Sequence, residues 1–202
     1  MHKLLKILKW TGMTLVVLFV VAEFIRWPFR VREEKTVELV AKIHNTKLTL
    51  DDVMGKNLPP DPGAEANKTI AGIDANNNGI RDDVEIAIFK AYPNSAKTRG
   101  PLLQYALTLQ LQMTLPIVNK DTVTATVEDN ESKADVCMWS LSSRKDMKKF
   151  TEETDKNENF VKGLQLNTKE RKDYLGNLFE GNLGSYNMSN DGCDIDLSTL
   201  PN

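Results

Sequence analysis

Hydrophobic residues are concentrated near the N-terminus, in a nearly continuous apolar run that follows three lysines. Lys3, Lys6 and Lys9 precede the segment 10–29, which is about as long as the roughly 20 residues that a helix needs to cross a bilayer. Basic residues beside such a helix favour the cytoplasmic side. The pattern therefore predicts a single-pass membrane anchor in residues 1–30. Its N-terminus would be cytoplasmic, and the bulk of the chain would be periplasmic or extracellular.

A cleaved signal peptide is the alternative for the same segment. Val20-Val21-Ala22 places small residues where signal peptidase cuts. We favour the retained anchor, because cleavage after Ala22 would leave an apolar new N-terminus at residues 23–28. No cysteine follows the apolar run, which excludes a lipid-modified N-terminus. Both alternatives export the remainder of the chain.

Beyond residue 30, apolar residues recur every three or four positions, which predicts a small, mostly α domain. Residues 31–60 are expected to form a juxtamembrane helical stalk and a proline-rich linker, although the stalk could equally pack on the domain. Thr49 is expected to cap a short helical turn over residues 50–54. Prolines at 59, 60 and 62 exclude a helix there. Residues 61–202 are expected to form the extracytoplasmic helical domain.

Turn residues and apolar spacing divide this domain into four predicted helices. They cover residues 84–92, 101–115, 131–143 and 169–180, with Pro93 ending the first, Gly100-Pro101 opening the second and Gly181 ending the last. The stretch 121–127 is expected to be a turn or extended, the charged run 144–163 a solvated face, and the tail 182–202 irregular. The polar residues of the second helix are uncharged, and no polar site is expected on it.

The segment from Asp74 to Glu85 carries the clearest chemical signal in the chain. It matches the calcium-loop pattern D-x-[DN]-x-[DN]-G-x5-E at every specified position. Calcium prefers six to eight oxygen ligands in a flexible arrangement, and side chains at alternate loop positions can supply them. Gly79 stands where the loop must turn sharply. The expected ligands are Asp74, Asn76, Asn78, the backbone carbonyl of Ile80, Asp82 and Glu85.

This loop resembles the EF-hand and the EF-hand-like loops of bacterial exported proteins, including dockerin modules. The resemblance covers twelve residues and implies bound Ca2+, without implying any activity of those families. Two features differ from a paired calcium sensor. The prolines at 59–62 preclude an entering helix there, and Arg81 occupies a position that is usually aliphatic. The chain has no second loop of this pattern, so a groove that opens with calcium is not expected.

An alternative explains the same residues without a metal, as an Asn- and Gly-rich turn followed by a helix that Asp82 caps. The complete pattern, with Glu85 in place, favours calcium. Only Asp74, Asp82 and Glu85 are carboxylates. Three carboxylates indicate a weak site, on the order of 10⁻⁴ to 10⁻³ M, which suits calcium outside the cell.

Both cysteines of the chain, Cys137 and Cys193, lie in the exported part. An even number of cysteines in an oxidising compartment predicts one disulfide, although two separate buried thiols are the alternative. A disulfide would tie the tail to a helix of the core.

Charge and residue content restrict the function. Residues 1–30 hold five Lys or Arg and one Glu, which leaves 21 basic and 27 acidic residues in the exported part. This acidity argues against a nucleic-acid partner. His44 is the only histidine outside the N-terminal segment, and no hydrolase or phosphate-binding motif is present. We expect a non-enzymatic calcium-binding module that meets a protein partner or has a structural role in the cell envelope. The alternative is a calcium-dependent hydrolase of cell-wall or glycan substrates.

Overall fold

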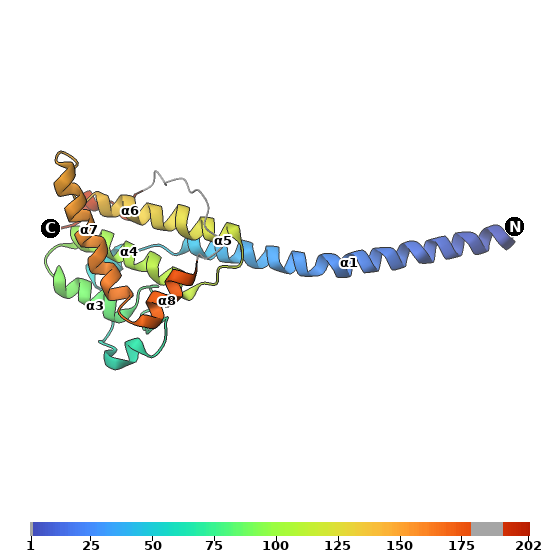
Figure 1. Ribbon diagram of the computed structural model, residues 1–202, viewed down its shortest axis with the longest axis horizontal. Helices are drawn as coiled ribbons and strands as arrows, with labels where there is room; N and C mark the ends of the chain where they lie inside the picture. Colours follow the sequence, from blue (N-terminus) through green and yellow to red (C-terminus); the bar gives the residue numbers. More distant parts are fainter. Residues whose placement is uncertain (1, 179–191) are drawn as a thin grey trace. The chain divides into compact units, whose positions relative to one another are not determined.

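The computed structural model describes residues 2–178 and 192–202, and these residues form helices and connecting loops without any strand. The expectation of a mostly α chain is therefore confirmed. In chain order (Figure 1) the helices are α1 (His2–Asn45), α2 (Leu50–Met54), η1 (Gly63–Asn67), α3 (Asp82–Ala91), α4 (Ala96–Thr114), α5 (Lys120–Thr124), η2 (Ala125–Glu131), α6 (Ser132–Trp139), α7 (Met147–Gln165), α8 (Lys169–Leu178) and η3 (Leu197–Thr199).

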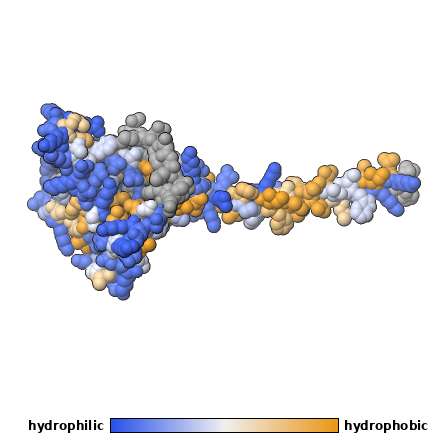
Figure 2. All heavy atoms as spheres, viewed as in Figure 1, coloured by the Kyte–Doolittle hydropathy of each residue, from blue (hydrophilic) through white to orange (hydrophobic). Residues whose placement is uncertain are grey.

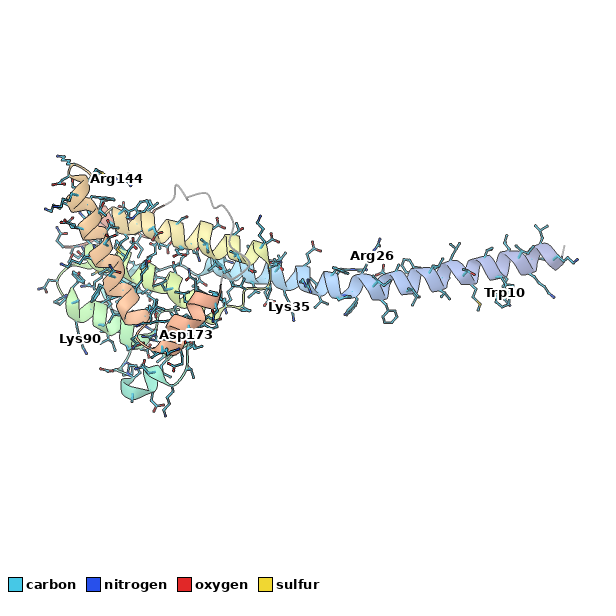
Figure 3. The ribbon with its side chains drawn as sticks, in the orientation of Figure 1. Trp10, Arg26, Lys35, Lys90, Arg144 and Asp173 are labelled. Atoms are coloured by element: carbon cyan, nitrogen blue, oxygen red, sulfur yellow. A yellow bond between two sulfur atoms is a disulfide. The ribbon has the colours of Figure 1, made fainter. Side chains whose placement is uncertain are left out.

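The first of two compact units spans Met1–Glu38 and consists of most of α1. Figure 2 shows an apolar surface around the middle of this helix, and Figure 3 shows side chains, Trp10 among them, pointing away from it on all sides. Among the described residues, α1 is the one helix long and apolar enough to cross a membrane. Its apolar window has a mean hydropathy of 1.9 and is not buried against other parts of the protein.

The second unit, Leu39–Asn202, is built around α4. This helix contacts α2, α3, η2, α6, α7, α8 and η3. Its apolar residues Leu102, Leu103, Tyr105 and Leu109 are almost completely buried, because neighbours cover the helix on every side. The predicted central helix is thus present, and the unit includes α2 and the proline-rich segment before the loop.

The start of α4 differs from the prediction. The helix begins at Ala96, where the hydroxyl of Ser95 accepts a hydrogen bond from the Thr98 N–H, one turn before Gly100-Pro101. Pro101 therefore lies inside the helix. Gly100 lies where a Cβ would be 3.3 Å from a methyl carbon of Leu197, so the missing side chain lets the C-terminal segment pack on the helix.

Residues 121–127 are helical where the sequence predicted a turn or an extended stretch, and the charged run 144–163, predicted to be a solvated face, is also helical. Residues 121–127 belong to α5 and to η2, a π-helix that continues into α6. Asn119 begins this run, because its side chain accepts from the Thr122 N–H and the Thr122 hydroxyl accepts from the Asn119 N–H. The charged run 144–163 contains most of α7, which buries Thr154, Val161 and Gln165 against the rest of the unit while its charged residues face outward.

The predicted short helix over residues 50–54 is confirmed as α2, with Thr49 as its N-cap. The third predicted helix is shorter than expected and ends at Trp139. The last begins at Lys169, and its predicted end at Glu180 and Gly181 lies outside the described residues, as does the first part of the tail.

The predicted disulfide between Cys137 and Cys193 is present. Cys137 is fully buried in α6, and residues 192–202 lie against the helical core. The Asp194 N–H donates to Gln104 Oε1 at 2.8 Å, and its carboxylate accepts from the Leu48 N–H at 3.0 Å. This end of the tail is consequently an ordered part of the unit, with the short helix η3 inside it.

Candidate metal site

The loop between η1 and α3 folds around the side chain of Asp74. One carboxylate oxygen of Asp74 accepts from the Asn78 N–H at 3.1 Å and the other from the Gly79 N–H at 2.9 Å. Asn77 and Gly79 have φ values of 56° and 84°, in the left-handed region that Asn and Gly tolerate best. A Cβ at Gly79 would lie 2.7 Å from a methyl carbon of Leu107. Local backbone chemistry therefore explains why these residue types occupy the turn.

Asp82 connects the end of the loop to its beginning. The Ala75 N–H donates to its carboxylate, with distances of 3.0 and 3.2 Å to the two oxygens, and the Asp82 N–H donates to the Ile73 carbonyl at 2.9 Å. The N-cap of α3 is Arg81, and no side chain caps this helix end. The proposed alternative role of Asp82 as the helix cap is therefore wrong.

Glu85 lies at the centre of the loop with 1% of its surface exposed. The Asn76 amide donates to Oε2 at 3.1 Å, and the Asn78 amide donates to Oε1 at 3.2 Å. Burial raises the pKa of the Glu85 carboxyl to about 7, against the two amide hydrogen bonds that lower it, while Asp52 and Asp82 raise it further. Burial also raises the pKa of Asp82. Negative charge is thus concentrated where little solvent screens it.

The predicted ligand side chains lie along one loop, where Asp74 and Asp82 accept from backbone N–H groups and Glu85 accepts from the amides of Asn76 and Asn78. Among the described residues, no three His, Cys, Asp or Glu side chains form a ready metal cage. Two ligand positions are asparagines, whose amide nitrogen and oxygen exchange places when the group turns over. Turning these amides over would present oxygen to a cation in place of nitrogen, and it would give up the hydrogen bonds that their oxygens accept from the Asn78 and Ile80 N–H groups. Ile80 is fully buried, its N–H donates to Asn78 Oδ1 at 2.9 Å, and its carbonyl stays a predicted ligand.

A cavity of about 600 Å³ borders the loop, and its lining includes residues that the sequence pattern did not indicate. Asp52 reaches it from α2 and Gln110 from α4. Gln110 is 3% exposed, and its Oε1 has no hydrogen-bond partner among the described residues. The second predicted helix, on which no polar site is expected from the sequence, thus has a buried polar side chain at this cavity. All groups around the cavity that could bind a cation are oxygens, which are the ligands that Ca2+ prefers, so a calcium ion fits this donor set.

Two buried arginines hold the loop in the core, and sequence reasoning missed both. Arg81 donates to the carbonyls of Leu164 and Gln165 at 2.7 and 3.1 Å and pairs with Asp83. Arg171 is fully buried without a carboxylate partner among the described residues, and it donates to three carbonyls and two asparagine side chains. The carbonyls belong to Ala66, Thr69 and Ile70, just before the loop. From sequence alone an arginine is expected to be exposed, and nothing in the residues around Arg81 or Arg171 indicates that either side chain is buried.

His44 lies at a second cavity of about 270 Å³ on the other side of residues 46–47. Its Nε2 is 2.7 Å from an oxygen of Asp129, and Lys133 forms an ion pair with Asp194 in the same cavity. The described residues that line this cavity include no serine or cysteine. The histidine has a carboxylate neighbour, and the threonines Thr46 and Thr108 line the same cavity.

Comparisons with protein-family models, with curated proteins and with solved structures found no match to this chain. The class of the protein therefore rests on its own features. It has an apolar N-terminal helix that could span a membrane and a compact helical unit closed by a disulfide.

Proposed function

We propose that this protein is a membrane-anchored module that binds Ca2+ through residues 74–85 outside the cytoplasm. The apolar N-terminal helix is the anchor, with its lysines in the cytoplasm, and the disulfide-bonded unit lies on the oxidising side. The ion has a structural role, and the module acts by contacting a protein of the cell envelope rather than by catalysis.

One observation supports the calcium site above the others. Glu85 is almost completely buried at the last position of the calcium-loop pattern, and the amides of Asn76 and Asn78 converge on its two oxygens. A buried carboxylate is costly unless an opposite charge or strong hydrogen bonds compensate it. A divalent cation in the same place would neutralise this charge and bind the loop oxygens together.

Calcium should stabilise the folded protein through binding linkage. At Ca2+ concentrations roughly ten- to thirtyfold above the dissociation constant, linkage gives about 1–2 kcal/mol. For a folded unit of this size, that free energy corresponds to about 2–8 °C in the unfolding midpoint. Magnesium demands a tighter octahedral geometry and should produce a smaller shift.

The test is thermal unfolding of the full chain in detergent with calcium, with magnesium and with chelator, combined with calorimetric calcium titration. Asp74→Asn and Glu85→Gln should abolish the calcium-dependent rise in midpoint. Glu152→Gln, which removes one exposed charge from α7, should preserve it. Identical unfolding curves in all three conditions, together with no heat of calcium binding, would refute the proposed function.

A further inference from the structure

Asp52 lies outside the twelve-residue loop, yet its carboxylate belongs to the same group of acids. It is 9% exposed and follows Thr49 by three residues at the start of α2. Its Oδ2 accepts from the Thr49 N–H at 2.9 Å and from the Thr49 hydroxyl, so this oxygen completes the helix cap. Its Oδ1 faces the other way and lies 3.5 Å from the side-chain nitrogen of Asn78. One oxygen of Asp52 is thus available to the loop.

The connection between α2 and the loop has a second contact. The Asn76 amide, which donates to Glu85, also donates to the Asn57 carbonyl at 3.0 Å. Asn76 and Asn78 therefore lie between the loop acids on one side and the segment 52–57 on the other. An ion that draws these two side chains together would act on both segments.

Gln110 supplies an independent observation at the same cavity. Its Nε2 donates to the Ala71 carbonyl at 2.6 Å, which fixes the side chain and leaves Oε1 without a donor. A buried oxygen that accepts no hydrogen bond destabilises the folded state. Gln110, Asp52, Asp74 and Asn78 line the same cavity. A cation in this cavity would satisfy the orphaned oxygen and be neutralised by the carboxylates.

We propose that the calcium site is composite: Asp52 supplies a fourth carboxylate and Gln110 an amide oxygen, in addition to the loop ligands. The inference rests on the proposed calcium function and extends it to residues that no calcium-loop pattern contains. It implies that the ion fastens α2 and α4 to the loop, so that calcium orders residues 48–54 as well as 74–85. A fourth carboxylate also strengthens the site relative to the three that the loop provides.

Calorimetric calcium titration of the full chain in detergent tests the assignment with two neighbouring substitutions. Asp52→Asn keeps the size of the side chain and an oxygen for the Thr49 cap, but removes the charge. It should weaken calcium binding at least about tenfold, since ligand charge count sets affinity in these sites. Asp51→Asn removes the same charge from the preceding, half-exposed residue, which pairs with Lys56, and should change affinity less than about twofold.

Three more measurements test the ligand roles of Asp52 and Gln110. Thr49→Ala removes the cap hydroxyl and should leave calcium affinity within about threefold, because a lost cap lowers helix stability rather than metal affinity. Gln110→Leu should weaken calcium binding by about threefold or more, since it deletes the oxygen but preserves the apolar contacts. Hydrogen exchange of residues 48–54 should slow when calcium is added to the natural protein, and this protection should vanish in Asp52→Asn.

The possible results distinguish the two proposals. If the natural protein binds calcium and Asp52→Asn binds it equally well, the composite site is wrong and the loop alone is the metal site. Equal weakening by Asp52→Asn and Thr49→Ala would overturn the ligand role in favour of the cap. Absence of calcium binding by the natural protein would refute the proposed function itself.

Discussion

Removal of the disulfide should lower the stability of the folded unit more than any other conservative substitution outside its core. Cys137 and Cys193 are 56 residues apart, so the bond closes a long loop in the unfolded chain. The chain-entropy relation for a loop of this length gives about 4 kcal/mol. For a folded unit of about 160 residues, each kcal/mol corresponds to about 2–4 °C, which predicts a fall in midpoint of about 8–16 °C.

When the disulfide is removed, noncovalent contacts alone hold residues 192–202 on the folded unit. Residues 192–202 place Asp194 against the Leu48 N–H and Lys133, Leu200 in the core, and the Pro201 carbonyl on the Lys97 N–H at 3.1 Å. Without the bond, these contacts alone must offset the entropy of ordering the tail. We therefore expect this segment to open before the helical core, with α6 losing its cover next.

The assay is thermal unfolding of the natural protein and of the Cys137→Ala/Cys193→Ser double variant, each with and without reductant. Reductant should lower the midpoint of the natural protein to that of the double variant and leave the variant unchanged. A midpoint for the double variant within about 2 °C of the natural protein would refute the estimate, since even about 1 kcal/mol would give a larger shift. An equal fall in midpoint for both proteins would show that the reductant does not act through the Cys137–Cys193 disulfide.

Three further predictions follow from buried groups. Arg171→Lys should destabilise the unit by about 2–4 kcal/mol in urea unfolding, because one ammonium cannot replace five directed donors and leaves buried carbonyls unpaired. Gly72→Ala should also destabilise it, by about 1–3 kcal/mol, because φ is 70° and the new Cβ would lie 2.3 Å from Arg81 Cδ. Burial raises the pKa of Asp135 to about 7, and the nearby Glu131 and Glu158 raise it as well. The free energy of unfolding should therefore vary with pH, and Asp135→Asn should reduce this variation by about 1–2 kcal/mol, a figure that already allows for solvent screening. The folded pKa exceeds the unfolded value of 3.8, so this stability is present at low pH and is lost as pH rises from about 4 to 7.

Each of these predictions has a matched control. Arg144→Lys, at an exposed arginine, should leave the urea midpoint unchanged, and equal losses at both arginines would contradict the role of Arg171. Gly163→Ala should be neutral or stabilising by up to about 1 kcal/mol, because this glycine is in α7 and has nothing within 4 Å of its Cβ position. For Asp135 the control is Asp155→Asn, at an exposed position of α7, which should leave the pH dependence of the unfolding free energy as in the natural protein. An unchanged profile for Asp135→Asn would show that its carboxyl is not the titrating group.

The sequence by itself determined the features that depend on neighbouring residues. The apolar run that forms α1 is readable because bilayer thickness fixes the length of a spanning helix. Thr49 and the acids after it indicate the start of α2, because a cap bonds within one turn. The turn at residues 77–79 follows from Asn and Gly, which tolerate positive φ.

Predictions of helix position from neighbouring residues were wrong at two places, the start of α4 and residues 121–127. Pro101 suggested a helix start, but Ser95 already caps α4 more than one turn earlier, and the helix continues through the proline although a proline there removes a hydrogen bond and crowds the preceding turn. The threonines of residues 121–127 suggested an extended stretch, because their β preference is visible in the sequence. The packing of η2 against α4 and against α5 is not visible there, and tertiary contacts override weak propensities.

Only the tertiary structure decided how the loop is held and which distant groups surround it. Arg171 lies about a hundred residues after the carbonyls that it binds, and Asp52 and Gln110 approach the loop from α2 and α4. Contacts at such separations depend on how whole helices pack, and no periodicity or motif encodes them. The twelve-residue pattern thus supplies the hypothesis of a calcium loop. The packing of three separate segments determined the charge, burial and extra oxygens around it.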